Sequence, residues 1–322
     1  MWGQAVERLC EQNNQSVETA CKLFGRTRQA YYQGRKDLDE RIRREQRIVD
    51  CVKEIRHMDS GIGCLKLWQM MQNMFQEDWV PGRDTFYGIL RRNGLMLKKP
   101  KPRHTTNSNH RFHKYKNLIK GFVPTAPNQL WVSDITYIDL EVGCCYLHLV
   151  TDAYSHKIVG WCLADTLEAL NTLRALQDAI RQAGLEDLHG LIHHSDRGVQ
   201  YCSNIYVEEL NKYQIQISMT EDYKPTDNAI AERVNGILKT EVIYREKRYK
   251  DLESALKRIG EFVDFYNNKR PHYSIGLKTP EQVYHEDGKQ KQMWKKKKYQ
   301  KTLPQITEVV TSQSQQTVPV MG

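Results

Sequence analysis

The chain has 322 residues, of which 39% are hydrophobic and 27% charged, and its 48 basic and 39 acidic side chains give a net charge of +9. This length predicts about two globular domains, and the composition excludes collagen-like and wholly disordered proteins. The sequence shows no signal peptide, no apolar run of about 18 residues and no C-x-x-C pair among its cysteines, so we expect a cytoplasmic protein with no membrane segment and with reduced, buried thiols.

Charge is distributed unevenly along the chain. Residues 111–240 carry more acidic than basic side chains, whereas the segments before and after them are net basic. Basic flanks suit a polyanion, whose phosphates attract Lys and Arg with release of counterions, and a carboxylate-rich centre suits metal chemistry on that polyanion. The pattern favours nucleic-acid binding without establishing it.

Two short helices on either side of Gly25 are predicted in the first unit, residues 1–40. Residues 16–33 have the dimensions of a helix-turn-helix, with an ordinary helical hairpin as the alternative interpretation. In a helix-turn-helix the second helix enters a DNA groove, so long polar side chains near its start reach base edges and phosphates. The candidate DNA-binding residues here are Arg26, Arg28 and Gln29.

Three further helices are predicted in residues 41–97. A polar helix at 41–56 is followed by helices at 64–76 and near 84–93. We interpret them as a second helical DNA-binding unit. Its last helix offers two candidate DNA contacts, Arg91 and Arg92.

After a basic linker at 98–120, the pattern changes to that of an α/β domain over 121–288. Short β-patterned runs precede an amphipathic helix, and strands then alternate with helices, which favours parallel pairing with right-handed crossovers. The expected strands are 129–138, 144–152, 157–164, 190–195 and 214–219, and the expected helices are 167–183, 203–213, one that begins after residue 227, and 252–266. The predicted fold class is therefore α/β, a mixed five-stranded sheet flanked by helices and preceded by all-α units. A basic, disordered tail is expected at 289–322.

Acidic residues accompany two of the predicted strands. Asp134 lies in the first strand and Asp196 just past the fourth, so parallel pairing of these strands would bring their carboxylates together at one edge of the sheet. Glu232, on the helix that begins after Asp227, shares a face with Lys239, because seven residues make about two helical turns. Three carboxylates could hold two Mg²⁺ ions for an in-line displacement at phosphorus. Judged from this helix alone, the alternative interpretation is that Glu232 and Lys239 are ordinary charged residues on a solvent-exposed face.

The three acids lie in sequence contexts that carry a family resemblance. The contexts are WVSDITYI, HHSDRGVQYCS and TDNAIAERVNGILKTE, with 35 residues between Asp196 and Glu232, and they occur together with LVTDAYSHKIVGW and YNNKRPHYSIGLKTP. Over about residues 16–288 the chain resembles transposases with a retroviral-integrase-like catalytic core. In particular, it is similar to the second-reading-frame product of the insertion-sequence-three family.

The resemblance implies an RNase-H-like core in which Asp134, Asp196 and Glu232 form an Asp-Asp-35-Glu triad that binds Mg²⁺, with Mn²⁺ as a substitute. It further implies three DNA-contact candidates in the core, Lys239, Arg197 and Asn228. The implied activity is metal-dependent DNA cleavage and strand transfer at the ends of an insertion sequence. The implied partners are double-stranded DNA, further copies of the chain in a homo-oligomer, and the first-reading-frame product of the same element, in the bacterial nucleoid.

Two other functions stay open on the sequence. A non-catalytic DNA-binding regulator of transposition would use the helical units and the basic flanks without needing the acid triad. A nuclease of the same fold would cut DNA without joining it.

Histidine and zinc chemistry is not expected. His193 and His194 precede Asp196 on a strand and should point to opposite faces, one packed in the core and one near the site, rather than bind a metal. His110-x-x-His113 lacks the cysteine pair that would complete a zinc module.

Overall fold

The structure is a computed structural model that describes residues 2–75, 79–97, 113–184, 188–221 and 229–288. The predicted tail, most of the predicted linker and Asn228 lie outside these ranges. No helix in the described ranges has both the length and the apolar character needed to cross a bilayer.

Three helices form the N-terminal unit: α1 (Trp2–Asn13), α2 (Val17–Leu23) and the beginning of α3 (Arg28–Met58). The hydroxyls of Ser16 and Thr27 cap α2 and α3 by accepting backbone N–H bonds, and Gly25 between the helices has a φ of +62°. The small core of this unit is Val6, Ala20, Cys21 and Tyr31.

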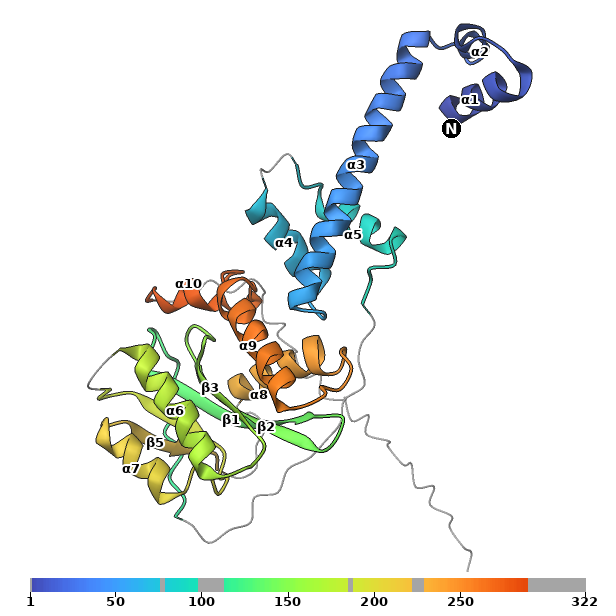
Figure 1. Ribbon diagram of the computed structural model, residues 1–322. Helices are drawn as coiled ribbons and strands as arrows, with labels where there is room; N and C mark the ends of the chain where they lie inside the picture. The colour runs from blue at the N-terminus through green and yellow to red at the C-terminus, as the bar shows by residue number, and fades with distance from the viewer. Residues whose placement is uncertain (1, 76–78, 98–112, 185–187, 222–228, 289–322) are drawn as a thin grey trace, which may run out of the picture.

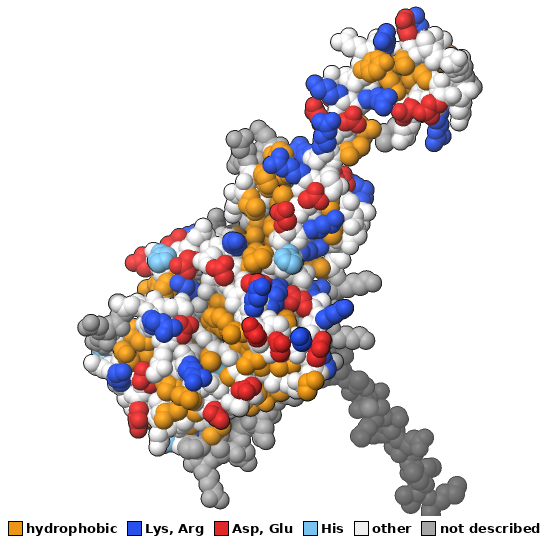
Figure 2. All heavy atoms as spheres, in the orientation of Figure 1, with side chains coloured by type: hydrophobic (Ala, Val, Ile, Leu, Met, Phe, Trp, Pro, Cys, Tyr) orange, Lys and Arg blue, Asp and Glu red, His pale blue; other side chains and the backbone are white. Residues whose placement is uncertain are grey.

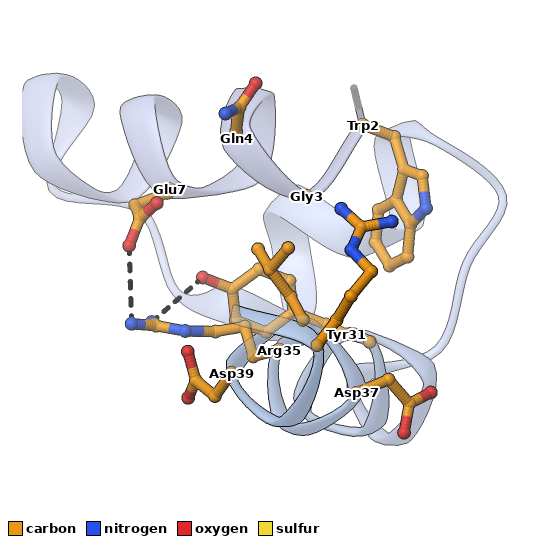
Figure 3. Close-up of a pocket in the computed structure, with 11 residues that line it drawn as sticks. Trp2, Gly3, Gln4, Glu7, Tyr31, Arg35, Asp37 and Asp39 are labelled. Carbon is orange, nitrogen blue, oxygen red and sulfur yellow. Dashed lines mark hydrogen bonds and ion pairs between the residues drawn. The ribbon is translucent and has the colours of Figure 1, made fainter. Parts of the chain in front are cut away.

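A pocket of about 610 Å³ lies between α1 and the first turns of α3 in this unit (Figure 3). Inside it Arg35 pairs with Glu7 at 3.4 Å and donates a hydrogen bond to the hydroxyl of Tyr31 at 3.3 Å. These contacts connect α1 to α3, so they help to hold the N-terminal unit together.

Helix α3 is continuous over 31 residues, which corrects the prediction of a short helix ending near residue 33 and a separate one at 41–56. The intervening residues contain no proline and are mostly Arg, Lys, Asp and Glu, which have good helix propensity or form i,i+4 contacts. Two such contacts are Gln33 with Asp37 and Gln46 with Asp50. The expected unit boundary at residue 40 therefore lies inside one helix, which projects from the rest of the molecule (Figure 1).

The second half of α3 packs with α4 (Cys64–Met74) and α5 (Arg83–Arg92). Their shared core includes Ile48, Val52, Leu67, Met71, Phe86 and Leu90. Phe265 from the C-terminal part of the chain belongs to the same cluster, so these helices are packed directly on the α/β domain.

A mixed five-stranded sheet forms the α/β domain, with strand order β3-β2-β1-β4-β5. The strands are β1 (Leu130–Asp139), β2 (Cys144–Asp152), β3 (Ile158–Ala164), β4 (Ile192–Ser195) and β5 (Gln216–Met219). The first three pair antiparallel in hairpin succession, whereas β4 pairs in parallel with β1 and with β5. The predicted pairing pattern is confirmed.

Helices cover both faces of the sheet (Figure 1). One face packs against α6 (Ala169–Ala183) and α7 (Asn204–Lys212), and the other against α8 (Ala229–Leu238), the π-helical turn η2 (Lys239–Ile243) and α9 (Leu252–Asn268). Two short elements, η3 (Tyr273–Ile275) and α10 (Pro280–Tyr284), follow. Since side chains alternate along each strand, both faces present apolar residues. The predicted α/β fold class, a mixed five-stranded sheet flanked by helices and preceded by all-α units, is confirmed.

Candidate active site

The register of the parallel pair β1–β4 brings two acidic residues together. Trp131 pairs with His193 and Val132 with His194, so two positions further along Asp134 lies beside Asp196, which directly follows β4. Burial and then the like charge of Asp196 raise the pKa of Asp134 to about 7. Two adjacent, half-buried carboxylates are therefore the centre of the site.

Groups from α8 and β1 hold the Asp134 carboxylate in place. The side-chain amide of Asn235 donates a hydrogen bond to one oxygen at 2.6 Å, and the backbone N–H of Ile135 donates to the other at 2.9 Å. Asn235 is 5% exposed, and its own carbonyl oxygen has no hydrogen-bond partner among the described residues. The sequence analysis missed Asn235, although its position one helical turn after Glu232 was a usable signal.

Lys239 acts on the same carboxylate from η2. Its positive charge lowers the pKa of Asp134, against the larger effects of burial and of Asp196 that raise it. The ammonium group of Lys239 is therefore close enough to the aspartate pair to act on its charge.

The loop after β4 shapes the other side of the pair. The backbone N–H of Gly198 donates to Asp196 at 2.9 Å, and a Cβ at Gly198 would lie 3.0 Å from that same oxygen. Tyr201 is buried, and its hydroxyl has no hydrogen-bond partner among the described residues. Burial, followed by the charges of both aspartates, holds the pKa of Tyr201 well above its usual value. Arg197, next to Asp196, is half-buried.

Glu232 lies apart from the Asp134–Asp196 pair. It lies in the first turn of α8 with its side chain exposed, and burial is the influence that raises its pKa, with no contribution from either aspartate. Within the described ranges, no three side chains of Asp, Glu, His or Cys lie close enough together to hold a metal ion. The structure therefore shows two carboxylates at the site, with the third candidate on the helix that contributes Asn235.

The predicted DNA-contact residues of the helical units lie at two places away from the aspartates. Arg26, Arg28 and Gln29 are exposed at the N-terminal end of α3, with Arg28 over the ring of Tyr32 at 5.5 Å. Arg91 and Arg92 are exposed at the end of α5. Arg92 forms an ion pair with Glu45 of α3 at 2.8 Å. Basic and acidic side chains are interspersed on the face shown in Figure 2 rather than gathered into one basic stripe.

The histidines before Asp196 are both packed. His193 is within hydrogen-bond distance of the hydroxyls of Ser133 (2.7 Å) and Tyr206 (2.9 Å), and His194 bonds to Ser218 at 2.8 Å. Both are buried, and the expectation that one of them lies near the site stays a prediction. Hydroxyl groups on neighbouring elements contact one ring nitrogen of each histidine, which lowers the cost of burying these polar rings.

All eight cysteines lie within the described ranges and are free thiols, and Cys21, Cys145 and Cys202 are buried. His113 packs edge-on against Tyr115, and His110 lies outside the described residues.

Known proteins that are similar to this chain include transposases of insertion sequences. The family described as "Integrase core domain" matches residues 124–225 and residues 213–280. The transposase for insertion sequence element IS629 of Shigella sonnei is 30% identical over 284 residues, which are 85% of this chain and 93% of that protein. Transposase InsF for insertion sequence IS3A of Escherichia coli K12 is 32% identical over 203 residues, 62% of this chain and 69% of that protein.

Among solved structures, the HTLV-2 integrase catalytic core domain in complex with magnesium, in its trimeric form, is 20% identical to the chain. The match covers 51% of this chain and 100% of that one, with a TM-score of 0.39.

The chain belongs to the insertion-sequence-three family of transposases with an integrase core. Its function is that of a transposase, which confirms the expectation drawn from the sequence motifs. The roles of individual residues do not follow from family membership, and the geometry of the site is the basis for assigning them.

Proposed function

We propose that the chain catalyses divalent-metal-dependent DNA cleavage and strand transfer at the ends of an insertion sequence, with Asp134 and Asp196 as metal ligands. The observation that supports this assignment is the β1–β4 register, which sets two carboxylates side by side where β4 ends. Mg²⁺ is the expected ion and Mn²⁺ the expected substitute, because both prefer carboxylate oxygen and water as ligands.

The residues present fit such an ion. Two adjacent carboxylates repel each other and are unfavourable unless a proton or a cation compensates them, and the partnerless carbonyl oxygen of Asn235 adds a further hard ligand atom beside Asp134. When bound, two ions would activate the attacking oxygen and stabilise the leaving oxygen at phosphorus. The Asn235 amide would then keep the Asp134 carboxylate oriented, which is its role in the structure described.

Glu232 is the proposed third ligand. Its support is its place on α8, three residues before Asn235, because residues three apart on a helix share one face. The exposed side chain is free to change rotamer, so it can turn toward the pair without repacking the core.

DNA contacts are proposed at two places in the molecule, beside the aspartate pair and on the helical units. Lys239 and Arg197 would hold the DNA end at the aspartate pair, since cationic groups can bind phosphate oxygens. Asn228, which lies outside the described residues, is proposed as a third contact because of its place in the motif before Glu232. The exposed groups on the helical units would bind DNA away from the reacting phosphate and determine which sequence is bound. These groups are Arg26, Arg28, Gln29, Arg91 and Arg92. A homo-oligomer that holds two DNA ends, and the first-reading-frame product, are the proposed protein partners.

A cleavage and strand-transfer assay on labelled DNA carrying the element's ends tests the assignment. We expect joined products with Mg²⁺ or Mn²⁺ for the unaltered chain and a loss of at least about a thousandfold for Asp196→Asn, because this variant would remove one of the two carboxylates proposed to hold the metal. The matched control is Asp139→Asn, an exposed acid near the end of the same strand β1, which should keep full activity. DNA binding should survive in both variants.

Other outcomes separate the alternatives. Joined products from Asp196→Asn at the unaltered rate would contradict the assignment of the metal ligands. Binding without cleavage by the unaltered chain, even with the first-reading-frame product added, would favour a DNA-binding regulator. Cleavage without joined products would favour a nuclease.

A further inference from the structure

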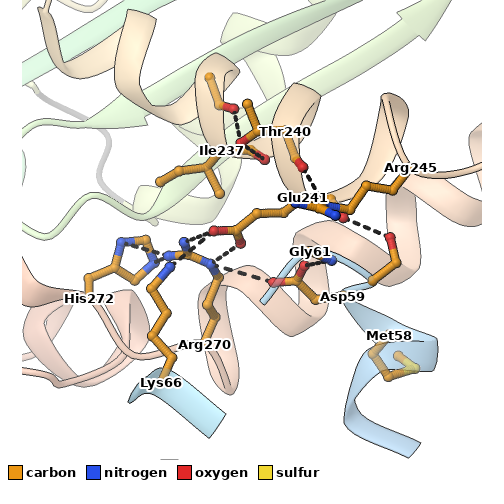
Figure 4. A network of polar contacts seen from close by, with 12 residues as sticks. Met58, Asp59, Gly61, Lys66, Ile237, Thr240, Glu241, Arg245, Arg270 and His272 are labelled. Atoms are coloured by element: carbon orange, nitrogen blue, oxygen red, sulfur yellow. Dashed lines mark hydrogen bonds and ion pairs between the residues drawn. The ribbon is translucent and has the colours of Figure 1, made fainter. Parts of the chain in front are cut away.

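The second half of α3, together with α4 and α5, is called the helical unit below. A buried cluster of charges lies where this helical unit meets the α/β domain (Figure 4). Glu241 comes from η2, Asp59 and Lys66 come from the α3–α4 region, and Arg270 follows α9. The guanidinium of Arg270 donates to both oxygens of Glu241, each at 2.7 Å, and the ammonium of Lys66 lies 3.0 Å from one of them. Arg270 is 1% exposed and Asp59 is fully buried, so the cluster is part of the interior.

The backbone of η2 is in direct contact with the turn between α3 and α4. A Cβ at Gly61 would lie 2.1 Å from the Cα of Glu241, so no larger residue fits at this position without displacing η2. The hydroxyl of Ser60 donates to the carbonyl oxygen of Glu241 at 2.7 Å. The turn therefore holds Glu241 by its backbone as well as by its side chain.

The charges in the cluster depend on one another. Burial by itself would raise the pKa of Glu241, but Arg270 and Lys66 lower it to about 2, so this carboxylate is ionised. Burial and the neighbouring charge of Glu241 raise the pKa of Asp59 above its usual value, against the opposing effect of Arg270. Glu241 is thus the anion that balances Arg270, and its loss would leave a buried guanidinium uncompensated.

The same short segment reaches the aspartate pair on its other side. η2 continues α8 without a break, and Lys239 at its start acts on Asp134, whereas Glu241 two residues later is held by the helical unit. One turn earlier Asn235 donates to Asp134. A π-helical turn is a rare local distortion that is frequently found at functional sites, and here it lies between the interdomain contact and the candidate active site.

We propose that Glu241 is a positioning residue for strand transfer: its ion pairs with Arg270 and Lys66 clamp η2 to the α3–α4 turn and thereby hold Lys239 and α8 at the aspartate pair. The inference rests on the proposed function of that pair. Its consequence is that the helical unit, besides binding DNA, completes the active site by its docking. The YNNKRPHYS motif gains a role, because it contributes the Arg270 that holds Glu241.

Hydrogen exchange on the full chain tests the clamp without requiring activity. In Glu241→Gln and in Gly61→Ala we expect backbone amides in residues 229–243 to exchange at least about tenfold faster, because local opening of a helix tracks the contacts that hold it. The matched control is Lys157→Met, which removes the ion pair between Lys157 and Glu281 elsewhere in the α/β domain and should leave this segment unchanged. Unchanged exchange in both clamp variants would overturn the proposal.

A kinetic double-mutant cycle tests the link to Lys239. We expect Glu241→Gln to slow strand transfer about tenfold in the unaltered chain but less than about threefold in Lys239→Ala, because the lysine's contribution has already been lost there. Equal losses in both backgrounds would show that Glu241 acts through general stability and would overturn the positioning role. Lys157→Met should give no loss in either background.

Two milder variants test the clamp if Glu241→Gln fails to fold, which a thermal melt without a cooperative transition would reveal. Ser60→Ala removes one hydrogen bond to η2, and Lys66→Met removes one cation at the edge of the cluster, so both change the clamp less severely. Each should show the same faster exchange and the same reduced effect in Lys239→Ala, and normal behaviour of both would overturn the proposal. If Asp196→Asn keeps strand transfer, the proposed function fails, while the exchange experiment still decides whether the clamp exists.

Discussion

At the scale of single residues, the candidate site depends on how one carboxylate is paired. Asp134 lies next to a second acid and accepts hydrogen bonds from Asn235 and from the backbone of Ile135. The repulsion between the two aspartates favours a cation or a proton, and the hydrogen bonds favour the ionised form. A metal-free site of this kind stores unfavourable electrostatic energy that ligand binding can relieve.

This leads to a prediction about pH and stability. Burial and then Asp196 raise the pKa of Asp134 from 3.8 to about 7, so the folded protein keeps a proton that the unfolded chain has lost. Without metal, the contribution of Asp134 to the free energy of unfolding should therefore fall as pH rises from about 4 to about 7. Asp134→Asn should remove this slope and make the metal-free protein more stable at pH 8, by up to about 4 kcal/mol.

Urea denaturation at several pH values in the presence of a chelator would measure this effect. Asp139→Asn is the control, since this exposed acid on the same strand should leave the pH profile unchanged. A profile for Asp134→Asn that matches the unaltered chain would show that the carboxyl group is not perturbed.

At the scale of secondary-structure elements, helices pack very close to the sheet where small residues allow it. Gly160 on β3 lies under α6, and a Cβ there would be 2.2 Å from the carbonyl oxygen of Ala175. Helix α6 therefore packs closer to the sheet than any larger residue at this position allows. The opposite face, with α8 and η2, carries the residues that contact Asp134.

Gly160→Ala should destabilise the protein by about 3 kcal/mol or more, because the atoms that a new methyl group would meet include backbone and cannot move independently. Gly34→Ala is the matched control, since Gly34 lies inside helix α3 with open space where the added methyl group would lie; it should be neutral or stabilising by up to about 1 kcal/mol. Chemical denaturation monitored by circular dichroism compares the two. Equal stability of Gly160→Ala and the unaltered chain would contradict the close packing.

At the scale of the whole molecule, α3 joins two separately packed regions of the chain. Its N-terminal end carries the small three-helix unit, and its C-terminal end packs against α4, α5 and Phe265 of α9. The exposed, highly charged middle of the helix spans the distance between them, as Figure 1 shows. The two predicted DNA-binding units are thus connected by a rigid helix instead of a flexible linker.

A break in this helix should weaken DNA binding without affecting the core. Glu40→Pro removes a helical hydrogen bond and clashes with the preceding turn, so it should kink α3 at an exposed position. If both units bind the same DNA end, the affinity should fall by about tenfold or more, because a fixed spacing raises the effective concentration of the second unit. Gel-shift titration would measure the affinity, with Glu40→Ala as the control. Unchanged affinity for the proline variant would show that the units do not bind DNA together.

The arrangement of the α/β domain was largely determined by local sequence patterns. Alternating apolar residues and short turns predicted the three antiparallel strands, and the alternation of strands and helices predicted the parallel pair that joins Asp134 to Asp196. These features depend on the period of side chains along the chain, which is visible without knowledge of the fold. The motifs around the acids likewise predicted the family, which the similar proteins confirm.

Other features were decided by tertiary structure alone. The exposed position of Glu232, the contact of Asn235 with Asp134, and the packing of both histidines before Asp196 depend on how α8 and the neighbouring strands lie against β1. The cluster joins the side chain of Glu241 to Arg270, 29 residues away, and to Lys66, 175 residues away. The sequence around each of these charged residues does not indicate which residue will pair with it. Their burial and their ion pairs arise only when the helical unit and the α/β domain pack together.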